Sequence, residues 1–251
     1  MVEIDVNHFS CRELNSHLRE TAEQTDRIVL LNPDARHNLV VGLTTAVSVT
    51  IQGSAGYFCA GLCDGPVLNV SGNVGWGFGD NLMNGLLSVD GNAGAVCGVA
   101  MRSGDVLVRG NIGSRAGQVM KGGTLLCLGN AGYRAGSMMM GGTIIILGDA
   151  REALGEFIMD GEIYVAGKIE SLGEDAVITE MRGEDDERLA RILEQHEVTY
   201  SGGFQKIISD QRALRYAEYE SGELLFGAGA EKKAQDAVVD GNRDVMNFDA
   251  D

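Results

Sequence analysis

Residues 110–128 read GNIGSRAGQVMKGGTLLCL, and residues 129–147 repeat the pattern as GNAGYRAGSMMMGGTIIIL. The leading glycine recurs every 19 residues along the middle of the chain, at Gly53, Gly72, Gly91, Gly110, Gly129, Gly148 and Gly167. A fixed short period of this kind is typical of a solenoid, in which each repeat forms one coil and stacks on its neighbours. The sequence therefore predicts a coil of 19 residues between Gly53 and Gly167.

Other positions of the unit repeat as well, and they are numbered below as offsets from the leading glycine. Glycine also stands at offsets three, seven and thirteen in most copies, with Ala60 at offset seven of the first copy and Arg151 at offset three of the last. Glycine suits corners where φ is positive or where two backbones approach too closely for a Cβ. Gly113 is one such corner, and we expect Gly113→Val to destabilise the coil through strain.

Four further offsets are apolar in nearly every copy, which predicts four columns of side chains that close an interior. The strand column at offset fifteen contains Leu68, Leu87, Val106, Leu125, Ile144 and Ile163. Its partner at offset seventeen, on the same face of the strand, contains Val70, Val89, Val108, Cys127, Ile146 and Val165. Offset ten contributes Cys63, Leu82, Met101, Met120, Met139 and Ile158, and offset two contributes Ala55, Val74, Ala93, Ile112, Ala131 and Ala150.

These features predict an all-β solenoid, a single-stranded right-handed parallel β-helix of about seven 19-residue coils. It has an N-terminal cap and a short helical C-terminal extension. The expected boundaries are 1–41 for the cap, 42–179 for the β-helix and 180–251 for a helical and extended acidic tail. One short strand per coil, joined by glycine corners, cannot bury its own apolar face, so stability must come from stacking neighbours.

The two ends of the chain carry local signals of their own. Ser10 and Glu13 fit a capping box that opens a helix through Arg19, and residues 28–31 are a plausible strand. Near the other end, residues 184–197 have apolar side chains at helical spacing, and residues 204–216 are a candidate second helix. Residues 217–251 are acidic and weakly patterned, which predicts an extended or disordered tail.

The composition limits the classes of partner and compartment. The formal net charge is −16, of which −3 falls in residues 1–150 and −13 in residues 151–251. So acidic a chain disfavours nucleic acid and anionic membrane surfaces as partners. No apolar run reaches the ~20 residues that span a bilayer, and the start lacks a secretory signal, so we expect a cytoplasmic protein. The five cysteines lack paired spacing and are expected to be packed, reduced thiols.

The repeats contain no recognisable set of catalytic residues, so we expect no catalytic residue, bound cofactor or metal site on this chain. All four histidines lie outside the block of repeats, and no nucleophile–base pair, metal-spaced Cys/His cluster or P-loop is visible. The run Met138–Met140 is better explained by one buried and two peripheral methionines than by a soft metal site. Offset one reads Ser54, Asn73, Asn92, Asn111, Asn130 and Asp149, which predicts a structural ladder of amides bonded to amides.

A possible docking strip for a partner is formed by four basic residues. Arg115 and Arg134 share offset five on adjacent coils, and Arg102 and Lys121 share offset eleven. Like charges stacked about 4.8 Å apart repel each other unless solvent screens them or an anionic group faces them. Screening by solvent alone is the simpler interpretation, a basic docking strip for an acidic partner is the functional one, and both stay open.

The recurring G-x-x-G-x-x-x-G, as in residues 110–117, resembles the GXGXG domain at the C-terminal end of the glutamate synthase large subunit, over about residues 40–180. With its cap and the run from Gly53 to Gly61, the chain is similar to the stand-alone GlxC-type subunit, as in N-methylglutamate synthase of methylamine metabolism. This resemblance implies a non-catalytic scaffold that braces a glutamine amidotransferase-like subunit against an FMN-binding glutamate synthase-like subunit. FMN and an iron–sulfur cluster would then belong to the partner.

Two other functions remain as alternatives. One is the GXGXG subunit of formylmethanofuran dehydrogenase, which accompanies a molybdenum or tungsten enzyme. The other is a catalytic β-helix enzyme acting on polysaccharide, which would need a row of surface carboxylates. Between Gly53 and Leu147 the acidic residues are Asp64, Asp80, Asp90 and Asp105, at unmatched offsets.

Overall fold

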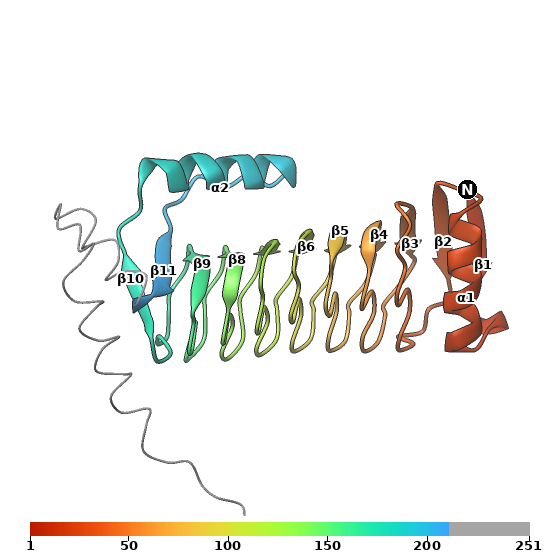
Figure 1. Ribbon diagram of the computed structural model, residues 1–251, viewed down its shortest axis with the longest axis horizontal. Coiled ribbons are helices and arrows are strands. Elements are labelled where there is room, and N and C mark those ends of the chain that lie inside the picture. Colours follow the sequence, from red (N-terminus) through yellow and green to blue (C-terminus); the bar gives the residue numbers. More distant parts are fainter. Residues whose placement is uncertain (211–251) are drawn as a thin grey trace, which may run out of the picture. The chain divides into compact units, whose positions relative to one another are not determined.

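The computed structural model describes residues 1–210, whose strands form one sheet that runs along a stack of coils (Figure 1). The strands of this part of the chain are β1 (Val2–Asp5), β2 (Arg27–Leu31), β3 (Ser48–Ile51), β4 (Asp64–Val70), β5 (Asn84–Val89), β6 (Asp105–Val108), β7 (Thr124–Cys127), β8 (Met140–Ile146), β9 (Asp160–Val165), β10 (Ala176–Thr179) and β11 (Gln205–Ser209). The helices are the 3-10 turn η1 (Val6–His8), α1 (Cys11–Ala22) and α2 (Gly183–Gln195).

Strand pairing confirms the predicted parallel β-helix. Each strand from β1 to β9 pairs in parallel with the next, and the repeated register places Leu87 opposite Val106 and Leu125 opposite Ile144. Both pairs are 19 residues apart, as the glycine period requires. A second ladder of single parallel bridges joins the coils at offset two, from Ala55 to Ile169. One strand and one bridge per coil therefore hold each turn to the next.

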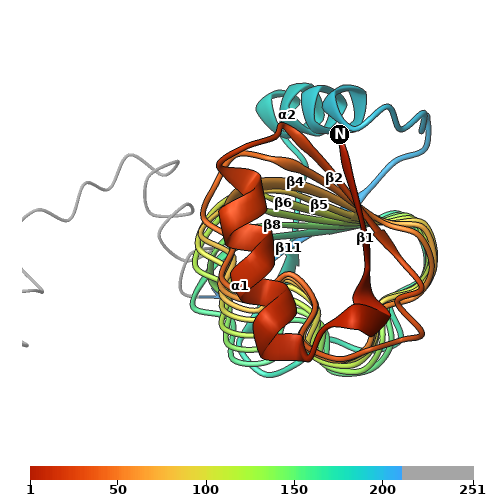
Figure 2. The ribbon, with the colours of Figure 1, turned by 90° about the vertical axis from the view of Figure 1, so that its right-hand side faces the viewer.

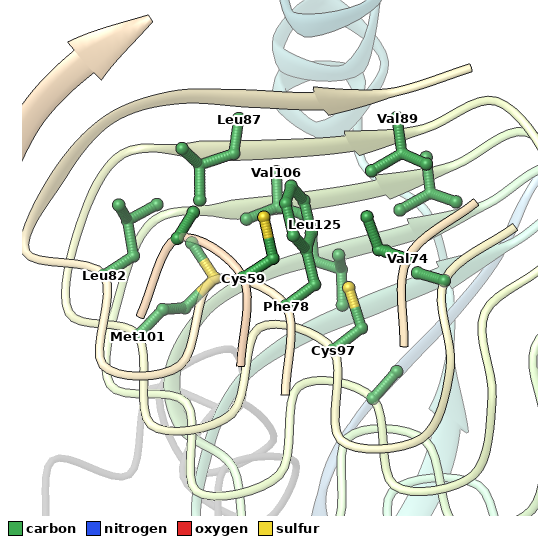
Figure 3. Packing of buried hydrophobic residues seen from close by; sticks show 14 of the residues in the cluster. Cys59, Val74, Phe78, Leu82, Leu87, Val89, Cys97, Met101, Val106 and Leu125 are labelled. Atoms are coloured by element: carbon green, nitrogen blue, oxygen red, sulfur yellow. The ribbon is translucent and has the colours of Figure 1, made fainter. Parts of the chain in front are cut away.

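The interior is filled by side chains in regular columns (Figure 3). All four predicted columns are buried, and each of their members is at most 5% exposed. A fifth column at offset six, which the sequence pattern did not predict, is equally buried and contains Cys59, Phe78, Cys97, Ala116, Ala135 and Leu154. Because all five columns face inward, the solenoid has a packed core.

The N-terminal residues close one end of this core. The predicted capping box is present, since Ser10 Oγ accepts the backbone N–H of Glu13 and the Glu13 carboxylate accepts that of Ser10. The helix it opens extends to Ala22, and its buried Leu14 and Leu18 join the core. Figure 2 shows α1 crossing the end of the coil. The same segment adds β1 and β2 to the sheet, so the cap and the solenoid share one ladder.

At the other end the sheet finishes with an antiparallel pair. β11 lies between β9 and β10 and is antiparallel to both. The predicted helix over 204–216 is therefore wrong for 205–209, and its remainder from residue 211 lies outside the described residues. Ile207 and Ile208 are fully buried, and a strand buries both because the last coil offers an unpaired edge. The acidic tail expected over 217–251 also lies outside the described residues.

The corner glycines serve two different needs. A Cβ built on Gly113 would lie 2.5 Å from the backbone nitrogen of Ala95, so glycine is required there by the close approach of two coils. Gly117 has φ +68°, a left-handed conformation that favours glycine. The glycines at offsets zero and three are mostly of the first kind, and those at seven and thirteen are of the second kind.

The ladder of asparagines differs in detail from the prediction. At every step from Asn73 to Asn130 the side-chain oxygen accepts the backbone N–H of the residue 19 positions later, at 2.8 Å. Amide-to-amide bonds accompany this contact only at Asn92 and Asn111 among the described residues. The ladder therefore satisfies main-chain donors between coils, and Asp149 continues it by accepting the N–H of Lys168 at 2.8 Å.

Candidate docking surfaces

Helix α2 lies along the stack and covers part of the outer face of the sheet (Figure 1). The outward column at offset sixteen is polar at Asn69 and Ser88 and then turns apolar. Its apolar members Leu107, Leu126, Ile145 and Tyr164 form a second buried cluster with Leu189 and Leu193 of α2. The helix predicted over 184–197 is confirmed, but its place on the sheet was not predicted. A change from polar to apolar along an outward column is the signal that could have located it.

A buried ionic cluster attaches the first half of α2 to the sheet. Lys206 Nζ lies 2.7 Å from Asp185 Oδ1 and 3.1 Å from Glu162 Oε1, and Tyr164 donates its hydroxyl to Asp185 at 2.7 Å. Arg188 contacts Glu162 and Tyr164 from the same helix. The backbone N–H of Arg182 is accepted by Asp185 at 2.9 Å, so one carboxylate both caps α2 and binds the sheet.

The electrostatics of this cluster are those of a satisfied ion-pair network. Burial by itself would raise the pKa of Glu162, but Lys206 and Arg188 outweigh burial and hold that pKa below its ordinary value. The pKa of Asp185 is lowered in the same way, against its burial, by Lys206 and by the Tyr164 hydroxyl. Burial and the hydrogen bond to Asp185 raise the pKa of Tyr164. All three groups are held in their usual charge states at neutral pH, which suits attachment of a helix.

The other end of α2 is fixed at the first residue of β6. Gln195 donates its side-chain amide to Asp105 Oδ2 at 3.1 Å, and His196 Nε2 lies 3.3 Å from the same oxygen. Asp90 pairs with Arg109 at 3.6 Å. Asp80 accepts the side-chain amide of Asn81 at 2.7 Å, so three of the four carboxylates considered for a polysaccharide enzyme are engaged in contacts within the chain.

No metal-binding group is formed by the residues that the structure describes, since no three His, Cys, Asp or Glu side chains come close enough to hold an ion. All five cysteines are free thiols, and every one except Cys11 is buried. Burial raises the pKa of Cys63 to about 11 and that of Cys127 to about 12, so neither is a thiolate at neutral pH. A shallow polar pocket of about 300 Å³ is lined by Asn130, Asp149, Ala150, Arg151, Lys168 and Glu170.

The four basic residues of the predicted strip lie in two rows at different corners of the coil. Arg102 and Lys121 are exposed just before β6 and β7. Arg134 is already partnered, because its Nε lies 2.8 Å from Glu156 Oε2 and its guanidinium lies 5.0 Å from the centre of the Tyr133 ring. Arg115 is exposed one coil earlier. Docking at this strip stays a prediction, with Arg102 and Lys121 as its more accessible pair.

A surface of exposed apolar side chains adjoins that pair. It consists of Met138, Met140, Phe157 and Met159, which are 40%, 42%, 40% and 50% exposed, and we call it the methionine edge. These residues occupy offsets nine and eleven on two adjacent coils, on either side of the buried offset-ten column. The expectation of one buried and two peripheral methionines in 138–140 is confirmed, because Met139 is fully buried. Phe157 and Met159, which extend the peripheral pair to the next coil, were not predicted.

A second exposed apolar surface lies near the N-terminal end of the stack. His37, Tyr57 and Trp76 stack on one another, with ring centres 4.4 Å and 5.5 Å apart, and we call these three residues the aromatic stack. His37 Nδ1 accepts the backbone N–H of Tyr57 at 2.8 Å, which orients the first ring. Phe58 is exposed beside the stack, and Trp76 is 56% exposed. Contiguous exposed apolar side chains of this kind make the aromatic stack a candidate docking surface.

Comparison with known proteins gives one informative relationship. The chain is 35% identical over 83 residues to Protein GlxC of Rhizobium meliloti (strain 1021), a match that covers 32% of this chain and 36% of that protein. The chain is therefore related to GlxC over a segment that spans about a third of the relative's length. No family model matches the chain. Among residues 1–210, no helix is long and apolar enough to cross a bilayer.

Proposed function

We propose that this chain is a non-catalytic scaffold subunit of a glutamate synthase-like complex, and specifically of N-methylglutamate synthase. In that role it braces a glutamine amidotransferase-like subunit against an FMN-binding glutamate synthase-like subunit. FMN and an iron–sulfur cluster would reside on the partner, together with the chemistry that joins methylamine to glutamate. The chain would act in the cytoplasm as part of a hetero-oligomer.

The observation that carries the proposal is a packed, regular stack with two separate exposed apolar surfaces. Tyr57 and Trp76 of the aromatic stack lie three to five coils from the methionine edge, which is about 14 to 24 Å along the axis at ~4.8 Å per coil. They also occupy different corners of the coil, at offset four for Tyr57 and Trp76 and at offsets nine and eleven for the methionine edge. A brace between two proteins needs two such surfaces on one rigid element.

The relationship to GlxC and the GXGXG-like repeat support the choice of complex. The repeat resembles the β-helix of glutamate synthase, and the structure of residues 1–210 has the coil that this resemblance implies. The polysaccharide enzyme has less support, because Asp90 and Asp105 are engaged within the chain. Formylmethanofuran dehydrogenase remains the alternative, since it also uses a β-helical subunit.

The test is purification of the native assembly through a tag on this chain. We expect an amidotransferase-like chain and a flavoprotein in fixed ratio, with flavin and iron and with neither molybdenum nor tungsten. Molybdenum or tungsten in the preparation would favour the alternative. A stable, solitary chain would contradict the scaffold role.

A further inference from the structure

The helix α2 shows how this solenoid binds a helix. Its Leu189 and Leu193, four residues apart, contact an outward column that supplies one apolar side chain per coil. Four helical residues rise about 6 Å, close to the ~4.8 Å between coils. A helix that lies along the stack can therefore meet successive coils with residues three or four positions apart. Where the column is polar, at Asn69 and Ser88, it contributes nothing to this cluster.

The same change from polar to apolar occurs at the corner next to the core column of offset ten. Offset eleven reads Asp64, Met83, Arg102, Lys121, Met140 and Met159, so two cations precede two methionines over the last four coils. Offset nine, which reads Leu62, Asn81, Ala100, Val119, Met138 and Phe157, becomes larger in the same coils without a change from polar to apolar. Unlike the column under α2, the four large apolar side chains of the methionine edge remain 40% to 50% exposed within residues 1–210.

The backbone at this corner is strained where the side chains project. Met138 has φ 55° and Phe157 has φ 56°, a left-handed conformation that L-residues with a side chain adopt only at an energetic cost. Glycine occupies the left-handed corners at offset seven of the same coils, at Gly136 and Gly155, without that cost. The same conformation recurs at offset nine in every coil from Leu62 to Phe157, so it belongs to the corner itself and sets the direction in which the Met138 and Phe157 side chains project.

We propose that the methionine edge, together with Lys121 and Arg102, binds an amphipathic helix of a partner subunit that lies along the stack. Apolar side chains of that helix contact Met138, Met140, Phe157 and Met159, and acidic side chains face the two cations. Four coils, from Arg102 to Met159, span three steps of ~4.8 Å, or about ten residues of helix. The recognised element is thus a helix of at least three turns with an apolar end and an acidic end on one face.

Charge decides between this partner and a second copy of the chain. In a parallel pairing of two copies the cations of one copy would face those of the other, and like charges at an interface are unfavourable. In an antiparallel pairing Lys121 and Arg102 would be placed against methionines and lose water without gaining an anion. An acidic helix avoids both costs, and methionines adapt readily to a partner's side chains.

The inference rests on the proposed function only in requiring that partner subunits exist. Its test is the oxidation of methionines by hydrogen peroxide in the purified native complex and in the isolated full-length chain. Accessible thioethers become sulfoxides, and covered ones are protected. We expect Met138, Met140 and Met159 to react in the isolated chain and to become as slow as buried Met139 in the complex. Met1 on the N-terminal cap is 70% exposed and lies outside the footprint, so its rate should not change.

Recovery of no complex would overturn both this inference and the proposed function. Recovery of a complex in which the methionine edge still reacts as in the isolated chain would overturn this inference alone. Slow oxidation of these methionines in the isolated chain would mean that the chain's own residues cover the methionine edge. That result would also overturn the inference.

A charge reversal and a cross-link test the acidic end of the helix. The double variant Arg102→Glu and Lys121→Glu should weaken binding of the partner at least about tenfold, and Arg12→Glu on α1 should not. A carbodiimide should join Lys121 to an acidic residue of a partner helix, identified by mass spectrometry. A cross-link to a second copy, or unchanged affinity of the double variant, would contradict the proposal.

Discussion

An added Cβ at Gly113 would lie 2.5 Å from the nitrogen of Ala95 and 2.6 Å from the carbonyl carbon of Gly94, both of them backbone atoms. Both atoms belong to the segment of the adjacent coil that accepts the Gly113 N–H, through Ala93 O at 2.9 Å, so the two backbones are held close together. We therefore expect Gly113→Ala to lower the free energy of unfolding by about 2 to 4 kcal/mol, measured by urea denaturation.

The matched control for this variant is Gly183→Ala. Gly183 begins α2 and has no atom within 4 Å of the position of a Cβ, so alanine fits and favours the helix. Equal stability of the Gly113 variant and the control would contradict the close approach of the coils.

Val119 is strained for a different reason, because a residue with a side chain adopts a left-handed backbone conformation there. It has φ 49°, and a β-branched side chain is a genuine outlier in this conformation. We expect Val119→Gly to maintain the free energy of unfolding or raise it by up to about 1 kcal/mol, because glycine relieves the strain. Val67→Gly, at an exposed position of β4, should instead lower it by about 1 kcal/mol. If Val119→Gly lowered the free energy of unfolding as much as Val67→Gly, the left-handed conformation of Val119 would be contradicted.

At the level of secondary elements, the attachment of α2 depends on Lys206. Removing its ammonium leaves Asp185 and Glu162 buried without the cation that lies 2.7 Å and 3.1 Å from them. We expect Lys206→Met to lower the free energy of unfolding by about 3 to 5 kcal/mol. Lys168→Met, an exposed lysine changed in the same way, should stay within about 0.5 kcal/mol of the parent. Similar losses in the two variants would show that the cluster contributes no more than a surface charge.

The same cluster predicts how stability depends on pH. The pKa values of Glu162 and Asp185 are lowered in the folded chain, so their stabilising effect is complete above the unfolded range and is lost as the pH falls. Stability should therefore decline below about pH 4, where carboxyl groups of the unfolded chain take up protons. Urea denaturation between pH 7 and pH 3 measures this, and Lys206→Met should decline less steeply. Equal slopes would contradict the role of Lys206.

The main elements of the solenoid follow from local pattern, and the exceptions have physical causes. The 19-residue register, four core columns and the capping box at Ser10 were predictable because each depends on spacing alone. The strand β11 was not, because Ile207 and Ile208 become a strand only beside the free edge of β9. The contact of α2 with Leu107 and Tyr164 likewise depends on where a helix folds back, although the apolar outward column could have indicated it.

For the molecule as a whole, the candidate surfaces were only partly predictable. Arg102 and Lys121 were identified because equal charges recur at one offset, but Arg134 is engaged by Glu156 through a contact between different coils. The methionine edge and the aromatic stack were missed. Apolar residues at corners cannot be separated from core residues until the coil shows which way each side chain points.

The most direct test of the scaffold role is native mass spectrometry of the two proposed partner subunits, mixed with and without this chain. We predict a single particle that contains the amidotransferase-like subunit, the FMN-binding subunit and this chain, and no association of the first two in its absence. Assembly of the two partners without this chain, or failure of this chain to join them, would contradict the scaffold role.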